Sequence, residues 1–188
     1  MTGSALGRAK LEGSGASVHA FAASSKGEIS LVVPQGRMRS AFAELLGINV
    51  TAGLGRLLSG DTGSTEIRCA VADFTVSNGV ATARTFVIAT TPLLATGTGT
   101  INLGAETMNV GIDGETKQPR LVRLWSPIKV EGPLTAPRVG VEGGTVAGQI
   151  GFGAALAALV NPLAALLTFV DPGLAEDANC GALISSAR

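Results

Sequence analysis

The sequence predicts a mainly β protein: an antiparallel meander with short helices and a C-terminal apolar helix. From Ser64 onward, short apolar runs recur at a spacing of about ten residues, with turn residues between them. Asn78-Gly79 separates two alternating runs and is the strongest hairpin signal, because a type I′ turn requires positive φ at both central residues. The 26 glycines and the absence of tyrosine also suit closely spaced strands and turns better than a large aromatic core.

The N-terminal part of the chain predicts two strands and a helical insertion. Residues 1–26 are rich in Gly, Ala and Ser, and we expect one strand around Ser17 to Ala23. The run from Gly27 to Val33 predicts a short strand that Pro34 ends. The pattern then changes to a helical period, which predicts a helical insertion near residues 38–58. One face of it would carry Met38, Phe42, Leu45 and Leu46, with Gly47 beyond the end of the first helix.

The central part predicts the strands of the meander. The first strand, from Ile67 to Val76, shifts its alternation near Ala72-Asp73, which predicts a β-bulge there. Its return strand is expected from Val80 to Thr90. Further strands are expected at Leu93–Leu103, Thr107–Asp113, Ile128–Val130 and Leu134–Val141. Three prolines near the last two strands place them toward an edge of the sheet, because proline cannot donate to a ladder.

We divide the chain into a β domain (1–142) and a second part (143–188) with a Gly-rich connector, an apolar helix and an acidic tail. No charged residue lies between Glu142 and Asp171, as in a membrane-spanning helix. However, Asn161-Pro162 would interrupt such a span, and the large side chains of Ala154–Val170 share one stripe. These features favour a helix laid on the sheet or on a membrane surface. The stripe includes Leu156, Leu159, Val160, Leu163, Leu166 and Leu167.

Composition and motifs argue against several function classes. The 14 basic and 14 acidic residues give no net charge, so a nucleic-acid partner is not expected. His19 is the single histidine and is expected to be a surface residue; with two distant cysteines it lacks metal-ligand spacing. No Gly-x-Ser-x-Gly motif is present. We therefore expect no cofactor, no metal and no enzymatic activity.

Two further features bear on the compartment. Cys69 and Cys180 would be buried thiols in a reducing cytosol, or a single disulfide in an oxidising compartment, and the sequence leaves both alternatives open. The first residues lack the apolar segment of a signal peptide. If the protein is exported, we expect its targeting element to lie outside this chain, which would then be a fragment.

Several of these patterns, taken in order, resemble the C-terminal region of AsmA-like cell-envelope proteins. A cysteine-containing strand leads to the Asn78-Gly79 hairpin, and a G-x-G-x-I-N-L strand follows at Gly97–Leu103. A P-I-x-V-x-G-x-L-x-x-P pair then runs from Pro127 to Pro137, and the segment Ala175–Cys180 also fits. The similarity covers nearly the whole chain.

The resemblance implies a periplasmic protein held at the inner membrane by an N-terminal helix that this chain lacks. It implies a curved, groove-like sheet that shields phospholipid acyl chains for outer-membrane biogenesis, with a membrane surface or envelope proteins as further partners. An oxidising periplasm favours a Cys69–Cys180 disulfide. The alternative is a non-catalytic structural or docking module with a closed core. The expected groove residues are Phe86, Ile88, Ile101, Leu103, Met108, Val110 and Ile112.

Overall fold

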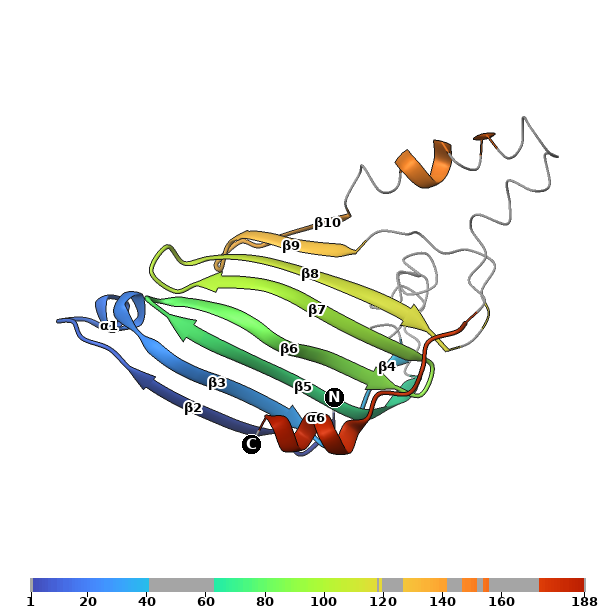
Figure 1. Cartoon of the computed structure of the whole chain (residues 1–188), viewed down its shortest axis with the longest axis horizontal. Helices are drawn as coiled ribbons and strands as arrows, with labels where there is room; N and C mark the ends of the chain where they lie inside the picture. The colour runs from blue at the N-terminus through green and yellow to red at the C-terminus, as the bar shows by residue number, and fades with distance from the viewer. Residues whose placement is uncertain are drawn as a thin grey trace.

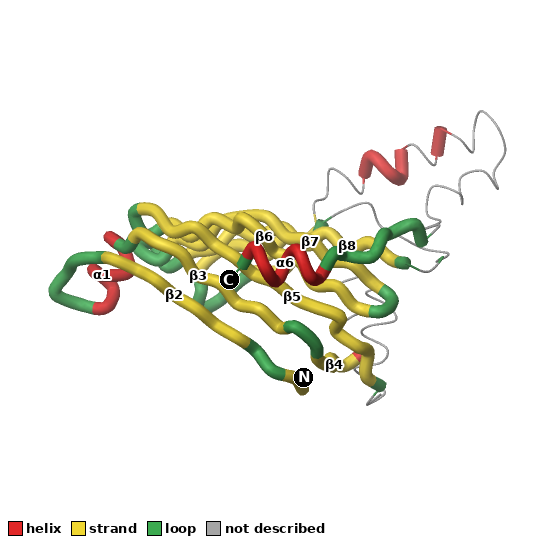
Figure 2. Tube along the Cα trace, turned by 60° about the horizontal axis from the view of Figure 1, so that its bottom comes forward, coloured by secondary structure: helices red, strands yellow, loops and turns green. Residues whose placement is uncertain are grey.

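The fold is a curved, open antiparallel sheet of ten strands (Figure 1), which confirms the predicted fold class. The computed structural model describes residues 2–40, 63–117, 119, 127–141, 147–151, 154–155 and 173–187. The sheet curves across its strands, and the helix α6 (Cys180–Ser186) lies on its convex side (Figure 2). The strands are β1 (Thr2–Gly3), β2 (Leu6–Glu12), β3 (Lys26–Val33), β4 (Gly36–Arg39), β5 (Ser64–Ser77), β6 (Val80–Thr90), β7 (Leu93–Asn102), β8 (Thr107–Thr116), β9 (Ile128–Pro133) and β10 (Arg138–Val141).

The strands follow the chain as a meander from β5 to β10. On the other side of β5, two strands lie end to end along the same edge. β3 pairs with Ala70–Val76 and β4 pairs with Ser64–Ile67, so the two act as one strand interrupted at Pro34-Gln35. β2 and β1 pair in turn with β3 and β4 and form the outer edge.

Two expectations for the N-terminal part are wrong. Instead of a strand near Ser17 to Ala23 the chain forms the helix α1 (Val18–Ser24), because the Ser17 side chain accepts a hydrogen bond from the Ala20 N–H and caps the helix. Three alanines follow and favour the helical state. Met38, expected to begin a helix, lies in β4 and is 3% exposed. The rest of the expected insertion lies outside the described residues.

The predicted hairpin between β5 and β6 is confirmed. Asn78 has a φ of 48° and Gly79 a φ of 73°, as a type I′ turn requires. The predicted irregularity near Asp73 is present, since the register shifts between Asp73 and Phe74; however, the extra residue is Arg84 on β6 and not a residue of β5. The β5–β6 ladder has a second shift, between Ile67 and Cys69, that we did not predict.

The tail packs on the sheet through α6. Leu183 and Ile184 of α6 pack on Val32 and Val71 of the sheet, so Cys180 is not its only contact. Residues 147–151 are helical where a loose connector was expected. Most of the expected helix from Ala154 to Val170, including all six leucine and valine positions named for it, lies outside the described residues. Among the residues that the structure does describe, no helix is long and apolar enough to cross a membrane.

We predict that Gly79→Ala destabilises the hairpin. A Cβ at this position would be held at positive φ, which costs roughly 1–2 kcal/mol, and would collide with the carbonyl oxygen of Ala23. Gly140→Ala is the matched control, because nothing lies within 4 Å of a Cβ there. Urea unfolding should show a loss of at least about 1 kcal/mol for the first variant and a change of less than about 0.5 kcal/mol for the second. Equal losses would contradict this account of the turn.

Candidate functional site: the apolar face of the sheet

The pairing register places the expected groove residues on one face of the sheet. Residues directly opposite each other on neighbouring strands share a face, as do residues two apart along a strand. Ile88 is opposite Ala95, and Ile101 is opposite both Ala81 and Met108. Six of the seven candidates therefore point to the same side, which we call the apolar face: Phe86, Ile88, Ile101, Met108, Val110 and Ile112.

The apolar face continues across the sheet to both edges. One row of partners runs from Gly97 through Ile112 and Ile128 to Val141 on the last strand. On the other side, Leu31 is opposite Ala72, which is opposite Phe86. The Phe86 ring lies directly over Gly97, where any Cβ would collide with it, so this glycine makes room for the ring and links the two halves of the row.

Exposure of the apolar face varies from place to place. All six candidates are partly buried. At the margins, Leu31 is 47% exposed and Val139 is 71% exposed, which is unusual for large apolar residues. At the two strand ends the same face is closed: Val76 is 2% exposed and Leu93 is fully buried. The middle and the edges of the face therefore offer apolar surface, whereas its ends are packed.

The seventh candidate, Leu103, is placed differently. β7 ends at Asn102, so Leu103 lies in the turn that follows, and its N–H donates to the carbonyl oxygen of Gly79 at 2.8 Å. In the same turn, the Oδ1 atom of Asn102 accepts hydrogen bonds from the N–H groups of Gly104 and Ala105. Leu103 therefore has no strand partner that would place it on the apolar face.

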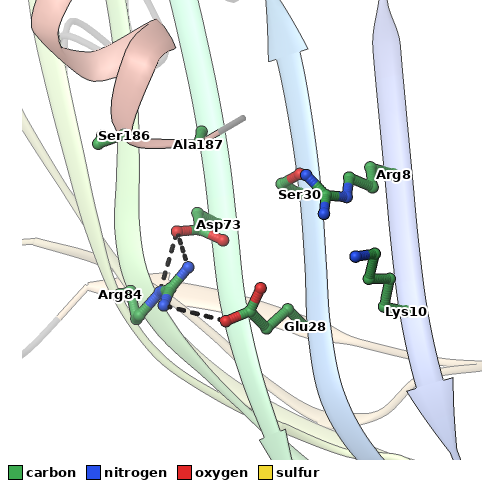
Figure 3. Close-up of a pocket in the computed structure, with 8 residues that line it drawn as sticks. All are labelled: Arg8, Lys10, Glu28, Ser30, Asp73, Arg84, Ser186 and Ala187. Atoms are coloured by element: carbon green, nitrogen blue, oxygen red, sulfur yellow. Dashed lines mark hydrogen bonds and ion pairs between the residues drawn. The ribbon is translucent and has the colours of Figure 1, made fainter.

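The opposite face, which we call the helix face, is polar and carries α6. On β7 it presents Thr96, Thr98 and Thr100, all exposed. Between β2, β3, β5 and β6 it carries a charged cluster (Figure 3). Arg84, the bulged residue, donates to the Asp73 Oδ2 atom from Nε at 3.0 Å and from Nη2 at 2.7 Å, and reaches Glu28 at 3.5 Å. The hydrogen bonds to Asp73 raise the pKa of Arg84, with a smaller contribution from the charge of Glu28.

The bulge explains why a carboxylate is tolerated there. The Asp73 side chain is 6% exposed, and burial of an unpaired carboxylate would be costly. The extra residue in β6 puts a guanidinium beside it. Sequence patterns located the bulge but did not identify this ion pair; the phase shift at an aspartate was the one signal that pointed to it.

A C-terminal strap, residues 173–187, is fixed to the helix face. The predicted disulfide is confirmed: Cys69 and Cys180 are bonded across a sequence separation of 111, with Cα atoms 5.8 Å apart. The N–H of Ala175 donates to the carbonyl oxygen of Thr116 at 3.2 Å. Asp177 accepts a hydrogen bond from the Lys117 Nζ atom at 2.6 Å and is also paired with Arg68. The strap thus joins β8, β5 and β3.

Two basic side chains favour the ionised form of the Asp177 carboxyl group in the strap. The hydrogen bonds from Lys117 and then from Arg68 lower the pKa of Asp177 below its ordinary value. The Lys117 side chain also donates a hydrogen bond to the carbonyl oxygen of Thr90. The sequence did not predict that Asp177 pairs with Arg68, because the two residues belong to a tail and a strand that lie far apart in the chain.

The single histidine lies at the surface of the described part of the chain. His19 is 57% exposed, and its Nε2 atom lies 3.0 Å from the carbonyl oxygen of Gly104, which ties α1 to the turn between β7 and β8. Within the described part of the chain, no group of three or more His, Cys, Asp or Glu side chains could hold a metal ion.

Sequence comparison agrees with the resemblance. The chain is 34% identical over 182 residues to the AsmA family protein YhjG of Escherichia coli (strain K12). The chain is AsmA-like. The aligned region is 97% of this AsmA-like chain but 26% of the length of that protein. No family model matches the sequence, and no solved structure matches it at a significant level.

We predict that the disulfide carries much of the stability of the strap. In the chain-entropy model, a cross-link closing a loop of this length stabilises the fold by roughly 4–5 kcal/mol. The Cys69→Ala/Cys180→Ala variant should lose about this much in guanidinium unfolding, and dithiothreitol should lower the midpoint of the unmodified chain alone. An unchanged midpoint of the unmodified chain in dithiothreitol would show that the strap does not depend on the bond.

We also predict an acid-sensitive contribution from Asp177. Its folded-state pKa lies below the unfolded value of about 3.8, so its stabilising effect is complete above that value and disappears as the pH falls through the folded-state pKa. Asp177→Asn should therefore be less stable than the unmodified chain at pH 6, and the difference should shrink below about pH 4. Unfolding free energies of both proteins, measured from about pH 6 to about pH 2, test this prediction. A difference that does not change with pH would exclude the mechanism.

Proposed function

We propose that this chain is part of an AsmA-like cell-envelope protein and that its apolar face shields phospholipid acyl chains from water. The proposal depends mainly on the pairing register, by which side chains from strand after strand present one continuous apolar surface. Transfer of hydrocarbon from water to such a surface is favourable by roughly 25 cal/mol per Å² buried. The action is passive and needs neither a cofactor nor a catalytic residue.

The placement of α6 supports this function. Its apolar residues pack on the convex side, on Val32 and Val71, whereas the apolar face is on the concave side (Figure 2). Partly buried and exposed apolar residues on a concave surface are suited to a flexible hydrocarbon ligand. The disulfide supports an oxidising compartment, in line with a periplasmic location at the inner membrane.

The alternative function is a structural module that docks to other envelope proteins through a closed core. The packed strand ends favour it, since Val76, Ala81 and Leu93 on the apolar face are 3% exposed or less. The partly exposed residues in the middle of the face and the well-exposed residues at its margins favour the lipid-binding function instead. The two functions differ in whether lipid occupies the middle of the face.

A charge placed on the apolar face should distinguish them. Val110 lies between Gly99 and Val130, in the middle of the face, and Thr98 lies nearby on the polar helix face. We expect Val110→Glu to reduce binding of a fluorescent phospholipid by about tenfold or more, because a carboxylate facing hydrocarbon is strongly disfavoured. Thr98→Glu, the matched control, should bind like the unmodified chain.

Lipid that co-purifies with the chain gives a second measurement. Mass spectrometry of the unmodified chain should detect phospholipid, and the Val110→Glu preparation should contain less of it. A lipid-free unmodified chain, together with equal affinities of the two glutamate variants, would refute lipid shielding and leave the docking module.

A further inference from the structure

The turn between β5 and β6 contains a chemically labile pair of residues. In an Asn-Gly sequence, the backbone nitrogen of the glycine can attack the side-chain Cγ atom of the asparagine, because glycine has no side chain to obstruct the approach. Asn78 is exposed to solvent and is followed by Gly79. Every other asparagine of the sequence is followed by Val, Leu, Pro or Cys. This turn is therefore the position at which the chain is most prone to deamidation.

The end of α1 holds the nitrogen that would attack. The Gly79 N–H donates a hydrogen bond to the carbonyl oxygen of Ser25 at 2.9 Å. Ser25 caps the C-terminal end of α1 and is fully buried, and Gly79 is buried as well. The carbonyl oxygen of Ala23 in α1 is so close that a Cβ on Gly79 would collide with it. α1 thus shields the reactive nitrogen at the start of β6 (Figure 1).

Deamidation would destroy this hydrogen bond. In its first step the Gly79 nitrogen bonds to the Cγ atom of Asn78, the Cγ–Nδ2 bond breaks, and ammonia leaves with the proton of the Gly79 nitrogen. Water then opens the cyclic imide at either carbonyl group, which gives aspartate or isoaspartate. The nitrogen of the imide carries no hydrogen, so the buried Ser25 carbonyl group would lose this donor. Such a loss is unfavourable for a buried acceptor.

α1 is itself held loosely. None of its seven residues is buried, and Val18 is 86% exposed. Surface contacts fix the segment, among them the contact at 3.0 Å between the His19 Nε2 atom and the carbonyl oxygen of Gly104. The Ser24 hydroxyl group also exchanges hydrogen bonds with the backbone of Ser14, at 2.6 and 2.8 Å. Segments with few buried apolar contacts open locally before the rest of a fold, so α1 should leave the turn more easily than β5 and β6 separate.

We propose that Asn78 is a latent deamidation site and that α1 is the element that protects it. While Ser25 accepts the hydrogen bond from Gly79, Asn78 remains an amide; when α1 detaches, the imide forms. Either product adds a negative charge, and isoaspartate also lengthens the backbone of the turn by one methylene group. Because the turn sets the register of a hairpin, α1 determines how long β5 and β6 keep their native connection.

The rate of deamidation, followed by peptide mass spectrometry in mildly alkaline buffer, tests the proposal. The free peptide Thr75–Thr82 should react at least about tenfold faster than the same residues in the folded chain, because it has no buried hydrogen bond to lose. Ser17→Ala removes the N-terminal cap of α1 and should accelerate the reaction of the folded chain several-fold. Thr98→Ala, at an exposed position on β7, is the control and should leave the rate unchanged. Equal rates for the peptide and the folded chain would overturn the proposal.

Hydrogen exchange of the Gly79 N–H identifies the protecting element. Its exchange rate and the rate of Asn78 deamidation are measured in the unmodified chain, in Ser17→Ala, and at urea concentrations below the unfolding transition. We expect the two rates to rise in proportion, since both require the bond to Ser25 to open. Faster exchange without faster deamidation would overturn the proposal and assign the protection to the geometry of the turn alone. Deamidation that accelerates in the Cys69→Ala/Cys180→Ala variant but not in Ser17→Ala would also overturn it, because global unfolding would then control the reaction.

Discussion

The register of the β-sheet is the constraint on which the other features depend. A shift of one residue at any strand would move its apolar side chains to the opposite face. Ladders from β3 to β10 keep residues such as Ala72, Phe86, Ile112 and Ile128 on one side. Two irregularities in the β5–β6 ladder would break this pattern if they were not matched to the side chains around them. Both bulges therefore determine which side chains of β5 and β6 lie on each face of the sheet.

The bulge between Ile67 and Cys69 determines which face the strap covers. Ile67 and Cys69 are two residues apart and would share a face in a regular strand. The extra residue, Arg68, separates them: Ile67 packs with Val33, Ala70 and Ile88 on the apolar face, whereas Cys69 bonds Cys180 on the helix face. Arg68 itself pairs with Asp177 of the strap. One inserted residue thus directs both the disulfide and an ion pair to the convex side, away from the apolar face.

Local chemistry made much of the sheet predictable, and long-range contacts account for most of what was missed. The Asn78-Gly79 turn needs positive φ, so its position was readable from two residues, and β6 begins and ends where the alternation does. α1 was mistaken for a strand because a seven-residue Ala-rich segment has no clear period, and its cap is a single serine. β2 was missed because its partner, β3, and not its own composition, makes it a strand. Six of the seven groove candidates share a face, but their common side depends on ladders that no single strand reveals.

The division of polarity between the faces also explains why α6 can be so short. A sheet normally buries its apolar face against its own helices. Here the seven-residue helix lies on the other side, where it covers the small apolar area of Val32 and Val71, and the threonines of β7 need no cover because water satisfies their hydroxyls. The strap is therefore not the lid of the apolar face. It lies on the convex side, so α6 does not cover the apolar side chains of the concave face.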